Sequence, residues 1–248
     1  MIALSLDNID DIPLYGEERL ADFGRTLIVA PHPDDESLGC GGAIALLRAM
    51  GFPVHVLFLT DGTLSHPRSR RYPAPALQTL REEEALAALA GLGVAASSMT
   101  FLRLKDRAAP HPGMSGFRAA AARCRHMMEA FLPATVLLPW RRDPHPDHRA
   151  AYSLVLDATR GLSPSPRLVE YPIWLWELGT VEDAPNDGEV RAWRLDIKRT
   201  LRAKQEAIAA HRSQTTDLID DDPDGFRLTP EILAHFMYPW EVYLEEST

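Results

Sequence analysis

The residues with the clearest chemistry follow an apolar run near the start of the chain. Leu27-Ile28-Val29-Ala30 leads directly into Pro31-His32-Pro33-Asp34-Asp35-Glu36, which places an imidazole and three carboxylates where a strand is expected to turn into a helix. Imidazole nitrogen and carboxylate oxygen suit zinc and other divalent first-row metals as ligands. Because Asp34 and Asp35 are adjacent, we expect their side chains to point in different directions, one toward a metal ion and the other toward its bound water.

A second group of the same kind comes much later in the chain. Val136-Leu137-Leu138-Pro139 precedes Asp143-Pro144-His145-Pro146-Asp147-His148, again a strand followed by a polar, His-rich loop. If Pro146 opens a helix, His145 and His148 share one face of it, so that one can coordinate a metal while the other faces substrate. We expect Asp147 to orient one of these two imidazoles. The two loops together can supply three ligands and leave an open position for water.

The flanking sequence predicts the elements that must bring these loops together. Apolar and amphipathic periods indicate strands at 25–30, 54–59, 99–104, 135–138 and 167–171 and helices at 41–50, 80–92, 117–132 and 146–159. This alternation is typical of a Rossmann-like α/β fold, a mostly parallel sheet with helices on both faces in three α/β/α layers. Ligand sites in such sheets lie at the carboxyl ends of the strands, where both loops begin.

The rest of the chain has a less regular pattern. It predicts a strand at 193–197, a helix at 198–211, a helix at 230–236 and a strand at 241–244. Because no Gly/Ser-rich linker precedes them, we expect residues 1–248 to form a single domain, with 175–248 an elaboration of it. Residues 63–76 carry prolines, arginines and histidines without an apolar period, which predicts a mobile surface loop.

Composition excludes several classes of function. The 248 residues are 46% hydrophobic and 25% charged, with a net charge of -9 that argues against a nucleic-acid partner. A local basic patch at Arg68, Arg70 and Arg71 is the exception. Two cysteines cannot form a disulfide framework, which favours a reducing, cytoplasmic setting. No run has the length of a membrane span and the N-terminal residues lack the pattern of a signal peptide, so we expect no integral membrane segment.

Other motifs have simpler interpretations. Gly39-Cys40-Gly41-Gly42 follows a strand, but a dinucleotide-binding GxGxxG would require glycine at Ile44. His66 and His111 lie in proline-containing loops and are predicted to be exposed. The later part of the chain has a group of aromatic residues, Tyr171, Trp174 and Trp176. We expect this group to lie in the core or at an interface rather than to stack on a sugar. An interface between copies of the chain would make the protein a homo-oligomer.

The two polar loops together resemble the PIG-L/LmbE-like zinc-dependent de-N-acetylases, whose hallmarks are a His-Pro-Asp-Asp-Glu loop and a later His-Pro-Asp-His. Shorter matches are Thr60-Asp61-Gly62, Arg81-Glu82-Glu83-Glu84 and His211-Arg212-Ser213-Gln214. The resemblance implies an enzyme that uses zinc-activated water to remove an acetyl or other acyl group from the amide nitrogen of an N-acetylglucosamine-type conjugate. Its expected partner is therefore a small-molecule N-acylated amino sugar.

The resemblance also implies roles for residues that match the motifs. It gives Asp34 the role of general base and His145 that of electrophile or general acid. The zinc ligands that it implies are His32, Asp35 and His148. Zinc is the expected metal, with another divalent first-row ion as the alternative.

Further positions in the resemblance concern the substrate. Arg81 and Asp106 fall where family members contact the sugar. Asp143 departs from the pattern, because mycothiol-precursor deacetylases have a tyrosine there that assists the tetrahedral intermediate. This carboxylate argues against mycothiol-type activity.

Two rival functions remain open from the sequence. A metal, a water and a carboxylate also serve esterases and phosphoesterases, and the arginine-rich loop from Thr63 would suit an anionic substrate. A non-catalytic carbohydrate-binding relative is the other rival. The presence of Asp34 beside the expected ligands argues against it, because a pure binding protein has no need of a base.

Overall fold

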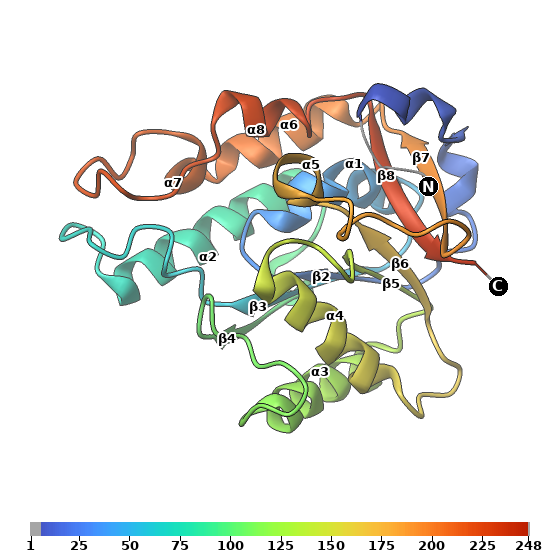
Figure 1. The fold of residues 1–248 in the computed structure, drawn as a ribbon, viewed down its shortest axis with the longest axis horizontal. Helices are drawn as coiled ribbons and strands as arrows, with labels where there is room; N and C mark the ends of the chain where they lie inside the picture. Colours follow the sequence, from blue (N-terminus) through green and yellow to red (C-terminus); the bar gives the residue numbers. More distant parts are fainter. Residues whose placement is uncertain (1–5, 248) are drawn as a thin grey trace.

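The computed structural model describes residues 6–247. Its strands form one sheet in the order β1-β7-β8-β6-β5-β2-β3-β4 (Figure 1). The strands are β1 Leu14–Tyr15, β2 Thr26–Ala30, β3 Val54–Thr60, β4 Met99–Leu104, β5 Thr135–Pro139, β6 Arg167–Tyr171, β7 Val190–Asp196 and β8 Trp240–Glu246. The α-helices are α1 Asp35–Ala49, α2 Ala74–Gly91, α3 Phe117–Phe131, α4 Pro146–Thr159, α5 Leu175–Leu178, α6 Leu201–Ala210, α7 Arg212–Thr215 and α8 Pro230–Ala234. Short 3-10 helices cover Leu6–Asp11, Glu17–Leu20 and Ala96–Ser98.

The centre of the sheet is parallel. β2 pairs in parallel with β3 and β5, β3 pairs with β4, and β5 pairs with β6. β8 runs antiparallel between β6 and β7. The predicted mostly parallel α/β sheet is therefore confirmed, and the carboxyl ends of the adjacent strands β2 and β5 meet at one edge.

Two hydrophobic layers enclose the sheet. Figure 1 shows α1, α2 and α6 on one side of it and α3 and α4 on the other. Successive side chains of a strand point to opposite faces of a sheet. Accordingly, Ile28 of β2 packs in the first layer, and Leu27 and Val29 pack in the second. Every residue of β2 is buried, as expected for a strand covered on both faces.

The first long helix begins earlier than expected. α1 starts at Asp35 rather than at residue 41, so the glycine-rich stretch is helical. Glycine is a poor helix former, which explains the error. At Gly39 a Cβ would lie 2.4 Å from the Tyr171 ring, and at Gly42 it would lie 2.6 Å from Ile197. These glycines let neighbouring elements approach the helix closely.

The predicted surface loop at 63–76 is buried in its first half, so its expected exposure is wrong there. Ser65, His66 and Ser69 are all buried, and His66 is only 2% exposed although it was expected to be exposed. The cause is residues 217–227, which lie against this loop. For example, the amide of Phe226 donates to the Ser65 carbonyl at 2.7 Å. Such a partner far along the chain cannot be identified from local composition.

The later elements continue the same sheet. β7 and β8 extend it beyond β6, and Glu241 of β8 accepts hydrogen bonds from the amides of Gly42 and Ala43 in α1. Lys204 of α6 forms a buried ion pair with Glu241 at 2.9 Å. These contacts support the proposal of a single domain. Among residues 6–247, none of the helices has the length and apolar character needed to cross a bilayer.

Close packing at Gly39 gives a testable stability difference. Gly39→Ala should lower the free energy of unfolding by about 1–3 kcal/mol, because the Tyr171 ring must move to accept the methyl group. Gly91→Ala at the end of α2 is the control, since a Cβ there meets no atom within 4 Å. Urea denaturation measures both variants. Equal stability of the two would contradict the close approach of α1 and β6.

Candidate metal centre and pocket

The first candidate loop has an unusual backbone conformation. Asp34, the residue before α1, has φ 142° and ψ -30°, a region that costs non-glycine residues free energy. Its amide donates to Glu36 Oε2 at 3.0 Å, and its carboxylate accepts from Arg81 Nη2 at 3.1 Å. The adjacent Asp35 carboxylate instead faces two imidazoles. The two aspartates therefore point apart, as expected from their adjacency.

Asp35 joins the two loops through a single oxygen atom. Its Oδ2 lies 3.3 Å from His32 Nδ1 and 3.3 Å from His148 Nε2. Ligand atoms at adjacent corners of a zinc tetrahedron are separated by about 3.3 Å when each metal–ligand bond has its usual length of about 2.0 Å. These two spacings therefore fit a shared divalent ion.

The second loop brings its imidazoles to the start of α4. This helix begins at Pro146, as predicted, and His145 caps it by accepting the Asp147 amide at Nδ1, 3.2 Å away. The rings of His145 and His148 have centroids 5.1 Å apart. Both imidazoles thus lie at the N-terminal end of α4 and near the loop that follows β2.

The carboxylate of Asp147 orients an imidazole of the other loop. Its Oδ2 lies 3.2 Å from His32 Nε2, and Asp106 Oδ1 lies 3.4 Å from the same nitrogen. The amides of Arg107 and Ala109 donate to Asp147, which fixes its position. The expectation that Asp147 orients His145 or His148 is therefore wrong, because its carboxylate extends across to the loop after β2. His32 has a carboxylate on each side.

Asp143 has the corresponding position beside His148. Its Oδ1 lies 3.4 Å from His148 Nδ1 and accepts the His145 amide at 3.0 Å. Its Oδ2 accepts the amides of Ile173 and Trp174 at 3.3 and 3.0 Å. This completely buried carboxylate connects the second loop to the turn after β6. No positive role for Asp143 was predicted from the sequence, although its place at the start of the His-rich loop was a signal.

Burial and neighbouring carboxylates shift the pKa values of the imidazoles in opposite directions. Burial disfavours the charged form of His148, but Asp35 and Asp143 outweigh it and raise its pKa to about 9. Burial also opposes charge on His32, whose pKa is nevertheless raised by the carboxylates around it. For His145, burial together with the neighbouring imidazoles lowers the pKa to about 4. The buried carboxylates thus favour positive charge between the loops, on a proton or on a metal ion.

Asp34 and Asp35 also differ in their electrostatics. Burial raises the pKa of Asp34 to about 6, even though the positive charge of Arg81 works against this. For Asp35, burial is outweighed by the facing imidazoles, which hold its pKa well below the usual range. The surroundings therefore favour the charged form of Asp35, while they move the pKa of Asp34 toward neutral pH.

The donor set passes a simple test for a metal site. Within residues 6–247, neither ring nitrogen of the buried His148 has a partner in hydrogen-bonding geometry, although each faces a carboxylate. Among the described residues, two groups that do not include Asp35 have donor atoms that all lie within 4.8 Å of one another; they are His32, His145 and His148, and His32, Asp106 and Asp147. Unpartnered imidazole nitrogens beside carboxylates suit a first-row divalent cation.

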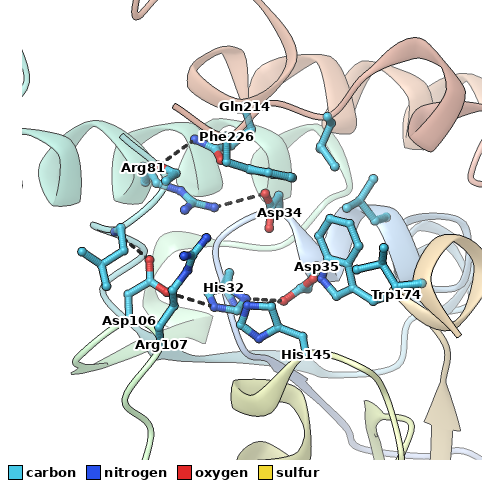
Figure 2. Close-up of a pocket in the computed structure, with 15 residues that line it drawn as sticks. His32, Asp34, Asp35, Arg81, Asp106, Arg107, His145, Trp174, Gln214 and Phe226 are labelled. Atoms are coloured by element: carbon cyan, nitrogen blue, oxygen red, sulfur yellow. Dashed lines mark hydrogen bonds and ion pairs between the residues drawn. The ribbon is translucent and has the colours of Figure 1, made fainter. Parts of the chain in front are cut away.

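A cavity of about 220 Å³ opens above this cluster. Figure 2 shows Asp106 and Arg107 on one side of His32 and Trp174 on the other, with Phe226 across the cavity. Of the predicted site residues, those that line the cavity are His32, Asp34, Asp35, Arg81, Asp106 and His145. Asp147 and His148 are buried behind it. The structure thus brings the predicted residues together, with two of them beneath the cavity surface.

Residues 211–213 contact both the first loop and α2. His211 Nε2 lies 2.9 Å from Glu36 Oε1, and Glu36 Oε2 accepts the Asp34 amide. Glu84 of α2 accepts the amide and hydroxyl of Ser213 at 2.7 and 2.6 Å. The His211–Gln214 match noted in the sequence therefore lies directly beside the strained turn.

Comparison with known proteins agrees with this geometry. Residues 27–159 match the family model of GlcNAc-PI de-N-acetylase, PIG-L. The chain is 33% identical over 195 residues to 2'-N-acetylparomamine deacetylase of Streptomyces fradiae, with 72% of this chain and 63% of that protein covered. It thus spans less than two thirds of that relative. It is 30% identical over 231 residues to 1D-myo-inositol 2-acetamido-2-deoxy-alpha-D-glucopyranoside deacetylase of Actinosynnema mirum, with 77% and 81% covered.

A solved structure gives the same result. N,N'-diacetylchitobiose deacetylase from Pyrococcus horikoshii superposes with a TM-score of 0.64 at 25% identity, covering 81% of this chain and 74% of that one. The family match includes both metal-type loops and extends over more than half of the 248 residues. The chain is therefore a member of the PIG-L de-N-acetylase family.

Proposed function

We propose that this protein is a metal-dependent hydrolase that removes an acetyl group from the amide nitrogen of an N-acetylglucosamine-type conjugate. The observation that carries the proposal is the arrangement of Asp34 and Asp35. One carboxylate faces two imidazoles at metal-ligand spacing, and the other faces the cavity beside it. The names of the three relatives described above, each a deacetylase of an amino-sugar compound, support this choice of reaction.

The residues proposed to hold the metal are His32, Asp35 and His148, with zinc as the proposed ion. A divalent ion at this position supplies a Lewis acid that polarises a carbonyl oxygen and makes water more acidic. Asp147 contacts the other ring nitrogen of His32 at 3.2 Å, and Asp143 faces the other ring nitrogen of His148 at 3.4 Å. Carboxylates in these positions orient metal-binding imidazoles. We therefore assign Asp147 a positioning role.

Asp34 is proposed as the general base. Its carboxylate lines the cavity and is fixed by Arg81, whose guanidinium also donates to the carbonyls of Gly62 and Pro33 at 2.9 and 2.7 Å. A fixed carboxylate of this kind can accept the proton of the attacking water and later transfer it to the departing amine nitrogen. In this geometry Arg81 positions the base, in addition to its proposed contact with the sugar.

His145 is proposed to donate a hydrogen bond to the substrate. Its Nδ1 accepts the Asp147 amide, which places the ring proton of the neutral imidazole on Nε2. A neutral donor in the cavity wall can stabilise the oxygen that gains negative charge during amide hydrolysis. We propose a neutral rather than a protonated His145, because the capping hydrogen bond requires a free electron pair on Nδ1.

The rival functions lose their main support. Two of the three arginines of the 63–73 loop, Arg68 and Arg71, pair with aspartates of the 220–224 segment, which leaves less positive charge for an anionic ester. A pure binding protein does not require the strained Asp34 beside the candidate ligands. The two cysteines are buried and unpaired, which supports the proposed cytoplasmic setting.

The proposed base gives the first activity test. Asp34→Asn should lower kcat by about 10²- to 10⁴-fold, because the amide cannot accept the proton of water. Release of acetate and primary amine from N-acetylglucosamine conjugates measures activity, and elemental analysis measures bound zinc. Zinc content should remain unchanged. Full activity of the variant would remove Asp34 from the mechanism, whereas loss of zinc would make it a ligand.

The two positioning carboxylates give a second test. Asp147→Asn and Asp143→Asn should each weaken zinc binding by about 10- to 100-fold, since each leaves an imidazole without its carboxylate partner. Competition with a chelating dye measures the affinity. Asp157→Asn, in the last turns of α4, is the control and should bind zinc as the unaltered protein does. Unchanged affinity in the first two variants would contradict the proposed ligands His32 and His148.

A further inference from the structure

The basic patch of the 63–73 loop is neutralised by an acidic segment. Arg68 and Arg71 form ion pairs with Asp224 and Asp220, and the amides of Arg70 and Arg71 donate to Asp221 Oδ2 at 2.8 and 3.0 Å. We call residues 63–73 and 217–228 the two rim loops. Because their charges pair with one another, the rim loops do not present a basic surface to the substrate.

The rim loops instead bring apolar side chains to the cavity. Backbone hydrogen bonds join Phe226 to Ser65 at 2.7 Å and Leu228 to Gln214 at 2.8 Å. The loops also pack without space between them, since a Cβ at Gly225 would lie 2.2 Å from the His66 ring. The position of Phe226 in the cavity wall is therefore fixed by several contacts rather than by one flexible loop.

Phe226 belongs to a continuous apolar wall. Its ring packs edge-to-face with Trp174 at a centroid distance of 5.6 Å, and Leu178 lines the cavity next to them while remaining 58% exposed. Figure 2 shows Trp174 on the opposite side of His32 from Asp106 and Arg107. Together with the two aromatic rings, this exposed leucine gives the cavity mouth an apolar surface of the kind that binds apolar groups.

We propose that this wall, formed by Trp174, Leu178 and Phe226, is a subsite for an apolar aglycone, an aryl or alkyl group attached glycosidically to the N-acetylated sugar. The inference rests on the proposed function, because the candidate metal and base fix where the amide must lie. In such a substrate the acetyl methyl group is bonded to the carbon that water attacks, so it would lie close to Asp34 and Asp35. The exposed end of the wall at Leu178 suits the part of the substrate that extends out of the cavity.

The test compares substrates that share one amide. We would measure kcat/KM of the zinc-loaded protein for the methyl, phenyl and hexyl glycosides of N-acetylglucosamine in both anomers. A methyl glycoside with an N-hexanoyl group tests the acyl side. The phenyl or hexyl glycoside should exceed the methyl glycoside by about 10-fold or more, the size of discrimination that a few buried apolar groups provide.

Variants then locate the preference on the wall. Leu178→Ser and Phe226→Ala should reduce the phenyl-to-methyl ratio toward one, and Leu178 is exposed enough for its variant to fold. Leu132→Ser is the matched control, because Leu132 is 66% exposed and precedes β5, at the opposite edge of the sheet. It should keep the ratio of the unaltered protein.

Different failures have different meanings. A ratio near one in the unaltered protein, with the methyl glycoside cleaved, would overturn the aglycone subsite and leave the deacetylase intact. Faster cleavage of the N-hexanoyl compound without an aglycone preference would also overturn it, by assigning the wall to the acyl group. If none of the conjugates is cleaved, the proposed function fails, and this inference fails with it.

Discussion

The candidate site depends on one carboxylate oxygen. Asp35 Oδ2 lies 3.3 Å from an imidazole nitrogen of His32 and 3.3 Å from one of His148, and all three side chains are buried. A buried anion needs a facing positive charge, or its desolvation is too costly. These residues are far apart in sequence, and they meet because β2 and β5 are parallel neighbours whose carboxyl ends share one edge of the sheet. The fold thus creates the need for a cation at this point.

Other features of the site can be understood as support for this arrangement. Asp147 contacts the far ring nitrogen of His32 and Asp143 faces that of His148, and backbone amides hold each carboxylate in place. The strained φ of Asp34 turns its carboxylate away from Asp35 and toward Arg81. Such strain persists only where surrounding contacts determine it, and here Glu36 supplies one of them. Two adjacent aspartates can therefore have different tasks.

Local patterns predicted much of this structure. The apolar strands and the Pro146 start of α4 were recognisable because each depends on nearby residues, and the places of the two polar loops followed from them. The pairing of Asp147 with His32 was not predictable, because it depends on how α4 lies beside the first loop. Likewise the burial of His66 depends on the distant 217–227 segment. Contacts between segments far apart in the sequence leave little signal in local composition.

The most direct test of this account is the crystal structure of the zinc-loaded protein, with anomalous scattering measured at the zinc edge. We predict one ion per chain, bound by His32, Asp35 and His148, with His145 and Asp34 facing the cavity beside it. An ion bound by His32, His145 and His148 without Asp35, or one between His32, Asp106 and Asp147, would contradict the central claim, since both groups have donor atoms close enough to bind a metal. Either result would require another explanation for the position of Asp35 between the two imidazoles.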